Sequence, residues 1–121
     1  MVNSLTERVI GAAIEVHRIL GPGLLESIYE EALCTELSLR NFCYERQKEV
    51  EVIYKGKIIK GQRIDLIVEK ELIVELKAVT NLPEIAMAQT LSYLRATNLK
   101  KALLINFSST RLIDGVKRIS L

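Results

Sequence analysis

The sequence predicts an α/β fold in which helices flank a mixed central sheet. Three observations carry this prediction: two helical segments open the chain, three β-rich segments follow, and a third helix then leads into an apolar strand. The 121 residues are 49% hydrophobic and 26% charged, which suits one compact domain with its own core. No repeat or Pro/Gly/Ser-rich linker divides the chain, so we expect a single domain over residues 1–121.

The first helix is predicted over residues 5–20. Ser4 and Glu7 form a capping-box pattern at its start. Gly21-Pro22-Gly23 ends it, because glycine admits positive φ and proline cannot continue a helix. A second helix starts at once and runs to about Arg40. The residues expected on the buried sides are Leu5, Val9, Ala12, Val16 and Ile19 in the first helix and Leu25, Ile28, Ala32 and Leu33 in the second.

Three strands are predicted after the second helix. Residues 45–54 read Glu-Arg-Gln-Lys-Glu-Val-Glu-Val-Ile-Tyr, with alternation and β-branched residues in the second half, which indicates a strand with a wet face that could lie at a sheet edge. The turn at 55–57 leads into a strand over 58–68, and the turn at 69–71 leads into a strand over 72–79. These segments therefore form consecutive antiparallel hairpins.

The last third of the chain adds a crossover. Asn81-Leu82-Pro83-Glu84 opens a helix that ends near Asn98, since proline suits the first turn and an acid favours the helix dipole there. Residues 102–107 are almost wholly apolar, as expected of a strand covered on both faces. A strand, helix, strand order makes 72–79 and 102–107 parallel. Residues 116–121 are expected to form a short edge strand.

Composition limits the compartment and the partners. The formal net charge is +2, so bulk charge alone argues for neither nucleic acid nor an anionic membrane. Cys34 and Cys43 lie in no metal-binding motif and are typical of thiols in a reducing compartment. No apolar run approaches the roughly 20 residues of a membrane-spanning helix. We expect a cytoplasmic protein with no membrane partner.

Charged residues interrupt the aliphatic strands at 58–68 and 72–79. Asp65, Glu75 and Lys77 stand among Ile, Leu and Val, where a charge is costly unless it is paired or binds a metal. With Lys70 at the centre of a three-residue hairpin loop, Asp65 faces Glu75 and Arg63 faces Lys77. Side chains paired in this way have Cβ atoms about 5 Å apart. The two carboxylates are therefore predicted to share one divalent cation.

This arrangement has a definite chemistry. Two adjacent carboxylates repel each other, and a hard cation relieves that repulsion while both stay ionised. Oxygen ligands select magnesium or manganese, which can polarise a phosphate and lower the pKa of an attacking water. The ammonium group of Lys77 can orient that water or stabilise charge on the phosphorane. The spacing thus indicates a phosphodiesterase site.

The pattern resembles a known superfamily. Asp65, a nine-residue gap and Glu75-Leu76-Lys77 on successive hairpin strands resemble the core of the PD-(D/E)XK nucleases, with their restriction-endonuclease-like fold. Residues 23–29, Gly-Leu-Leu-Glu-Ser-Ile-Tyr, fit the motif of its GxxExxY family. Residues 89–93, Gln-Thr-Leu-Ser-Tyr, match the QxxxY signature of RecB-like members. Together these segments cover about residues 23–107.

The resemblance implies a magnesium- or manganese-dependent nuclease acting on DNA, with RNA as the alternative. It implies that Asp65 and Glu75 ligate the metal, that Lys77 serves the nucleophile, and that Glu26 reaches the metal directly or through water. Gln89 and Tyr93 would brace the site or touch substrate. The supporting residues of this prediction are Gln89, Tyr93, Tyr29 and Arg63.

Other interpretations of the same residues stay open at this point. Glu75 with Lys77, or Asp65 with Arg63, could be ordinary ion pairs, and Tyr29 could be a core residue. His17 is the only histidine and is not expected to act as a general base. The fold could also be an inactive module that binds nucleic acid or protein, or a structural protein without nucleic-acid contact. A homodimer or a partner protein is compatible with each of these functions.

Overall fold

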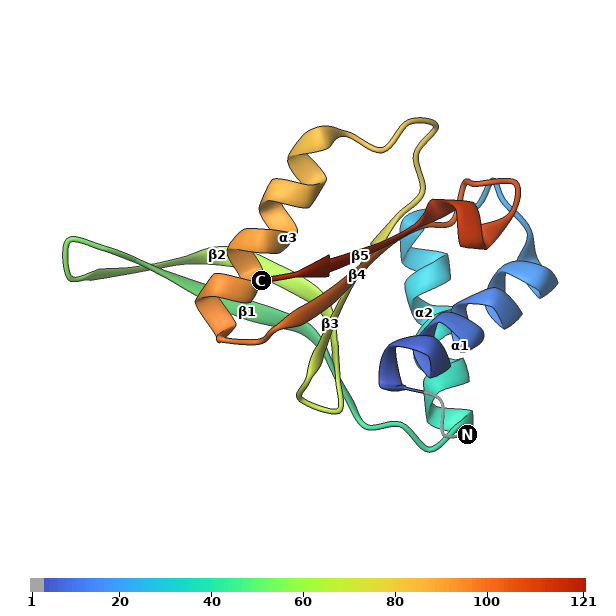
Figure 1. Ribbon diagram of the computed structural model, residues 1–121, viewed down its shortest axis with the longest axis horizontal. Coiled ribbons are helices and arrows are strands. Elements are labelled where there is room, and N and C mark those ends of the chain that lie inside the picture. Colours follow the sequence, from blue (N-terminus) through green and yellow to red (C-terminus); the bar gives the residue numbers. More distant parts are fainter. Residues whose placement is uncertain (1–3) are drawn as a thin grey trace.

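A computed structural model, which describes residues 4–121, places five strands in one sheet of order β1-β2-β3-β4-β5 (Figure 1). Only β3 and β4 are parallel, and the other neighbours are antiparallel. The predicted mixed sheet and parallel crossover are confirmed. The elements are α1 (Leu5–Leu20), α2 (Glu26–Leu39), β1 (Tyr44–Tyr54), β2 (Lys57–Val68), β3 (Leu72–Lys77), α3 (Glu84–Thr97), β4 (Lys101–Asn106), the 3-10 turn η1 (Leu112–Gly115) and β5 (Val116–Ser120).

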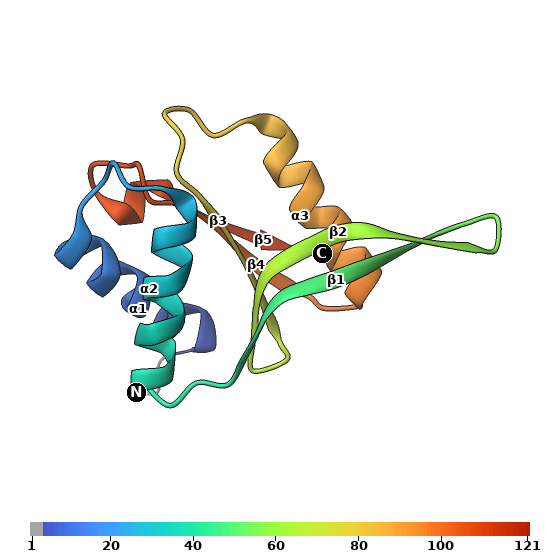
Figure 2. The ribbon, with the colours of Figure 1, turned by 180° about the vertical axis from the view of Figure 1, so that it is seen from behind.

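The sheet has a core on each face. Helices α1 and α2 cover one face and α3 covers the other, as the two opposite views show (Figures 1 and 2). Alternate residues of β3 point to opposite sides: Leu72, Val74 and Leu76 pack with α1 and α2, whereas Ile73 packs with α3. By the same alternation, Glu75 and Lys77 belong to the α3 face.

The start of α1 follows the prediction. Its first residue and its last are those expected, and the Ser4 hydroxyl accepts a hydrogen bond from the Glu7 backbone N–H at 3.2 Å. This bond satisfies one of the N–H groups that a helix leaves without a partner in its first turn.

None of the helices within residues 4–121 combines the length and the apolar character that crossing a membrane requires.

Part of the predicted helix packing is wrong. Ile19, Leu25 and Ile28 are 63%, 73% and 47% exposed. Leu25 precedes the first turn of α2, and Ile28 lies beside the stripe that enters the core. Residues four apart on a helix share a face, and the buried members of that face are Tyr29, Leu33 and Leu37.

Strand β3 ends two residues earlier than predicted. After Lys77 the backbone leaves the sheet, and the side chain of Asn106 takes over its hydrogen bonding. The Asn106 amide accepts from the Val79 N–H at 3.1 Å and donates to the Val79 carbonyl at 2.9 Å. This side chain therefore fixes the chain that follows β3.

Gly115 is needed for a close approach at the end of η1. A Cβ atom built there would overlap Ser109 Oγ and lie 2.5 Å from the Asn106 carbonyl oxygen. Backbone cannot yield as a flexible side chain does, so we expect Gly115→Ala to lower the free energy of unfolding by about 2 kcal/mol or more. Urea unfolding measures this change.

The matched control is Gly11→Ala in α1. Its added Cβ would meet only Arg40 Nη1, at 3.6 Å, and alanine is favoured over glycine inside a helix by about 1 kcal/mol. Gly11→Ala should therefore stabilise the protein. Equal stability of Gly115→Ala and the wild type would contradict the predicted clash.

Candidate active site

Strands β2 and β3 separate partway along their length, and we call the point of separation the fork. Their ladder runs from Val68 opposite Leu72 to Leu66 opposite Val74, and β3 then turns away from β2 (Figure 1). The next residues in register are Asp65 and Glu75, as the three-residue loop predicts. The ladder does not continue to the predicted pair of Arg63 and Lys77, because the strands have already diverged.

The two acids complete the hydrogen bonding that the fork interrupts. The Leu76 N–H donates to Asp65 Oδ2 at 2.9 Å, and the Asp65 N–H points to Glu75 Oε2 at 3.4 Å. Each carboxyl group thus accepts from the backbone of the opposite strand. Because an unpaired buried N–H is costly, this exchange draws both side chains to one place.

Glu75 is the buried member of the pair, with 6% of its surface exposed. Burial raises its pKa to about 10, and hydrogen bonding to Asp65 and the negative charge of Asp65 add to the effect. Lys77 opposes it with its positive charge. Burial and the neighbouring negative charge therefore both favour the protonated form of Glu75 when no cation is bound.

Lys77 lies on the same face as Glu75 and is half-buried. Its charge acts on Glu75 and on Glu26. In the part of the chain that the structure describes, no ion pair within 4.0 Å involves Asp65, Glu75 or Lys77. The ordinary ion pairs considered for Glu75 with Lys77 and for Asp65 with Arg63 are absent there.

Glu26 stands in the first turn of α2 and is exposed. Partial desolvation and then the charge of Asp65 raise its pKa, so its carboxyl group lies within electrostatic reach of the fork. Across residues 4–121, however, no three His, Cys, Asp or Glu side chains come close enough together to hold a metal ion. Glu26 approaches the pair of acids without joining it.

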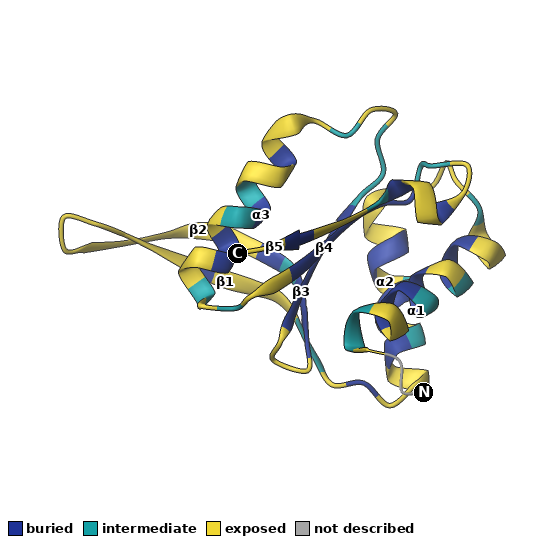
Figure 3. Ribbon diagram, in the orientation of Figure 1, coloured by how far each residue is buried: buried dark blue, intermediate teal, exposed yellow. Residues whose placement is uncertain are grey.

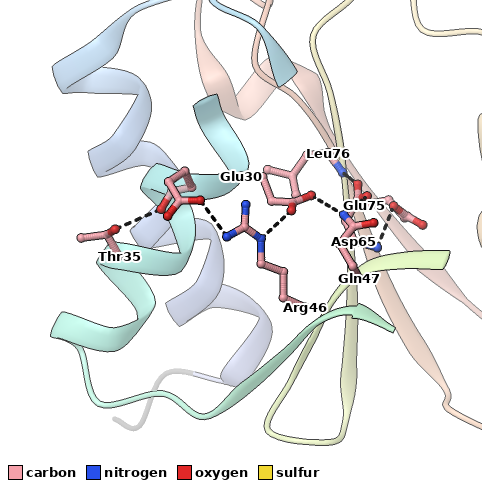
Figure 4. A network of polar contacts seen from close by, with 8 residues as sticks. Glu30, Thr35, Arg46, Gln47, Asp65, Glu75 and Leu76 are labelled. Carbon is pink, nitrogen blue, oxygen red and sulfur yellow. Dashed lines mark hydrogen bonds and ion pairs between the residues drawn. The ribbon is translucent and has the colours of Figure 1, made fainter. Parts of the chain in front are cut away.

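A polar network connects α2 to the fork (Figure 4). Glu30 is buried and accepts from Arg46 Nε at 2.7 Å and from Gln47 Nε2 at 2.9 Å. The Gln47 amide also donates to Asp65 Oδ1 at 3.3 Å. Arg46 reaches Glu31 as well, at 2.7 Å, and its pKa is raised by the hydrogen bonds to both acids. The helix thereby orients Asp65 through one amide.

Sequence reasoning missed this network. Gln47 has a φ of 54°, a left-handed conformation that non-glycine residues rarely adopt and that often marks functional sites. It lies between the β1–β2 pairs Arg46–Leu66 and Lys48–Ile64, which places it opposite Asp65. The available signal was the Glu26–Glu30 spacing of four, which puts two acids on one helical face.

The supporting residues take different positions. Tyr29 is fully buried and stacks on Phe107, with ring centroids 4.6 Å apart. Its hydroxyl donates to the Gly21 carbonyl and accepts from the Leu24 N–H at 3.1 Å. Tyr29 therefore holds the loop before Glu26 and is part of the core.

Tyr93 comes closer to the acids. It is 3% exposed, and burial and then the charges of Glu75 and Asp65 raise its pKa. Gln89 is half-buried one turn earlier on α3. Arg63 is exposed on β2, where its backbone lies opposite that of Glu49 in β1. The fork thus brings together Asp65, Glu75 and Lys77, with Tyr93 and Glu26 nearby.

The donor set suits a hard cation. Two carboxyl groups that each accept from the backbone of the other's strand supply only oxygen ligands, and Mg²⁺ is commonly held by one or two carboxylates while it keeps several waters. Burial of Glu75 next to Asp65 disfavours a second negative charge there, and this raises the pKa of Glu75. A divalent cation would supply the missing positive charge.

Comparison with known proteins defines the class. The family model of the PD-(D/E)XK nuclease superfamily matches residues 3–119, so the chain belongs to that superfamily. Membership suggests a nuclease with nucleic acid as its substrate, and superfamily members generally use divalent metals.

One solved structure, titled "Crystal structure of SSO0001", matches with a TM-score of 0.50 and 19% identity. The match covers 98% of this chain and 78% of that one. At this identity the similarity shows the fold alone. No curated protein matches the chain.

The raised pKa of Glu75 predicts that the free energy of unfolding depends on pH. The unfolded chain loses the Glu75 proton near pH 4.5, the ordinary pKa of a glutamate side chain, whereas the folded protein keeps it to about pH 10. The unfolded state therefore binds fewer protons between these values, and the free energy of unfolding should fall as pH rises through them. Urea unfolding in chelator at about pH 5.5, 7 and 8.5 measures the slope.

Glu75→Gln should flatten this slope, because glutamine cannot ionise. The control is Glu51→Gln, since Glu51 is an exposed acid on β1 and its replacement should leave the slope in place. Parallel profiles for Glu75→Gln and the wild type would contradict the account of Glu75.

Proposed function

We propose that this protein is a divalent-metal-dependent nuclease that hydrolyses phosphodiester bonds in DNA. The observation that carries the proposal is the convergence of the Asp65 and Glu75 carboxyl groups at the fork, with Lys77 on the same face. Membership of a nuclease superfamily supports it. Within that superfamily we assign the chain to the GxxExxY branch, on the match of residues 23–29 to its motif.

The roles follow from position. Asp65 and Glu75 would hold magnesium or manganese directly, and Glu26 would reach the ion through water from the start of α2. When bound, such an ion polarises the phosphate and lowers the pKa of a coordinated water. Lys77 would hold that water in line or stabilise negative charge on the phosphate. Gln47 orients Asp65 from the side of α2.

An inactive binding module is the second candidate, and one observation favours it. The acids already have partners without a cation, because the Leu76 N–H and the Gln47 amide both donate to Asp65. A scaffold of this kind would be stable without metal. It would also gain nothing when metal is added.

We expect Asp65→Asn and Lys77→Met each to lower manganese-dependent cleavage of a DNA duplex by about 100-fold or more, the usual effect of losing a group that stabilises developing charge. Both replacements keep the side-chain volume, so circular dichroism and melting should show an intact fold. Lys100→Met is the control, since Lys100 is exposed at the far end of the sheet. Gel-based cleavage of a labelled duplex gives the rate.

Metal binding separates the two candidates. A nuclease site should raise the melting temperature of the wild type when Mn²⁺ is added, and Asp65→Asn should remove that gain. No gain in the wild type, together with no cleavage, would leave the binding module as the function. Wild-type cleavage by Asp65→Asn would end the nuclease proposal as stated.

A further inference from the structure

The outer part of the β1–β2 hairpin projects far from the body of the protein (Figure 1). We call residues 52–63 the arm. Every residue of the arm is exposed (Figure 3), while Val50 and Ile64, which flank its base, are buried. A two-stranded ribbon without a covering layer gains little stability from its own contacts. The arm is thus built to project, and its residue types indicate what it meets.

The arm is net positive, although the exposed acids Glu49 and Glu51 of β1 face its base, opposite Arg63 and the register shift. Four of the 17 basic residues and none of the 15 acidic residues of the chain lie in it, so the rest of the molecule is net acidic. Lys60 approaches Glu49 at 3.9 Å with both side chains exposed, and such a contact is weak. The basic residues of the arm are Lys55, Lys57, Lys60 and Arg63.

The arm also exposes large apolar side chains. Ile53, Tyr54 and Ile58 are 72%, 61% and 55% exposed, and Val52 and Ile59 are 45% and 44% exposed. Because neighbouring residues of a strand point to opposite sides, Ile53 and Ile58 share one face of the arm and Val52, Tyr54 and Ile59 share the other. Both faces of the arm therefore expose apolar side chains. Apolar side chains on a basic ribbon suit a polyanion whose interior is apolar, because such wedges insert between base pairs while lysines neutralise phosphates.

Strand β2 links the arm to the fork. Lys57 at the tip and Asp65 at the fork lie on this one strand, eight residues apart. The bulge at Gly61 shortens the usual rise of about 3.4 Å per residue, so the two residues are about 25 Å apart along the strand. A duplex rises 3.4 Å for each base pair along a strand. A duplex lying along β2 with its phosphate at Asp65 would therefore meet the tip about seven base pairs away.

The base of the arm is bent. The pairing register shifts between Val50 and Val52, and Gly61 on the facing strand has a φ of 131°. Bulges of this kind bend and twist a ribbon. The arm is therefore directed by its own backbone and does not simply extend the plane of the sheet.

We propose that the arm is a duplex-binding element that lies in a groove of DNA about seven base pairs from the phosphate held at the fork. This inference rests on the proposed function for its substrate. A groove of B-DNA admits a two-stranded ribbon, and the charge of the arm complements the phosphates that border it. A second copy of the chain is a poorer occupant, because two arms would bring eight like charges together.

The test compares two triple variants that remove the same charge. Lys55→Gln/Lys57→Gln/Lys60→Gln changes the arm, and Lys100→Gln/Lys101→Gln/Lys117→Gln changes exposed lysines at the far end and far edge of the sheet. Fluorescence anisotropy with a 30-base-pair duplex in chelator measures affinity across a salt series. Circular dichroism and melting confirm that both variants fold.

The arm variant should bind at least about tenfold more weakly, and its slope of log affinity against log salt should shrink by about 2 to 3, near 0.9 for each lost phosphate contact. The control variant should keep the wild-type slope. Tyr54→Ala should weaken binding without a change in slope, since it removes no charge. Wild-type affinity and slope in the arm variant would overturn the proposal.

A series of shorter duplexes, measured in calcium in place of chelator so that the fork can hold a phosphate, tests the geometry. Wild-type affinity should drop once the duplex is too short to reach from the fork to the tip, and the arm variant should show no such step. Sedimentation of the wild type and the arm variant tests whether the arm contacts a second copy of the chain instead. If the wild type is a dimer, the arm variant is a monomer and the salt slope of DNA binding is the same in both, duplex binding by the arm is overturned in favour of contact between copies.

Binding in chelator does not require turnover, so the two proposals fail separately. Arm-dependent binding without any cleavage would support the arm and reject the nuclease. Metal-dependent cleavage, together with equal duplex affinity in the wild type and the arm variant, would support the nuclease and reject the arm.

Discussion

The candidate site depends on the point where strands β2 and β3 stop pairing and diverge. Where β2 and β3 diverge, their backbone ladder ends at Leu66 and Val74, and side chains accept from the N–H groups of Asp65 and Leu76. The carboxyl groups of Glu75 and Asp65 take these positions. Because each acid is tied to the backbone of the other strand, the two acids must meet, and burial on the α3 face then makes two negative charges there unfavourable. One constraint thus creates both the pair and its need for a positive partner.

The surroundings keep this pair in position from two sides. From α2, the buried Glu30 holds the Gln47 amide, which in turn reaches Asp65. Beyond the end of β3, Asn106 holds the backbone at Val79, two residues after Lys77. Groups fixed in this way lose little freedom when a cation or a phosphate arrives. Strand β2 carries both Asp65 and one side of the arm, so the arm and the acids keep a fixed relation along one strand.

The sequence was informative where the interaction is local. The Ser4 cap, the glycine and proline after α1 and the three-residue loop at Lys70 each act over a few residues, and they predicted a helix boundary and the register of the acids. The separation of β2 from β3 was not predictable, because it depends on how a whole sheet twists around its helices. It removed the expected pair of Arg63 and Lys77.

The rest of the site is non-local. Glu30 and Gln47 are 17 residues apart and meet through a left-handed conformation at Gln47 that no local pattern requires of glutamine. The exposure of Ile28 was missed for a similar reason, since apolar periodicity does not say which of two adjacent stripes a neighbouring helix will cover. Roles for Asp65, Glu75 and Lys77 came from spacing and resemblance together, whereas the residues that orient them required coordinates.

The most direct measurement of the central claim is a crystal structure of the wild-type protein grown with manganese, with anomalous scattering recorded to locate the ion. The account predicts one anomalous peak at the fork, within about 2.2 Å of oxygens from both Asp65 and Glu75. If the two carboxyl groups keep their backbone hydrogen bonds and the ion lies elsewhere or is absent at saturating manganese, the account is contradicted.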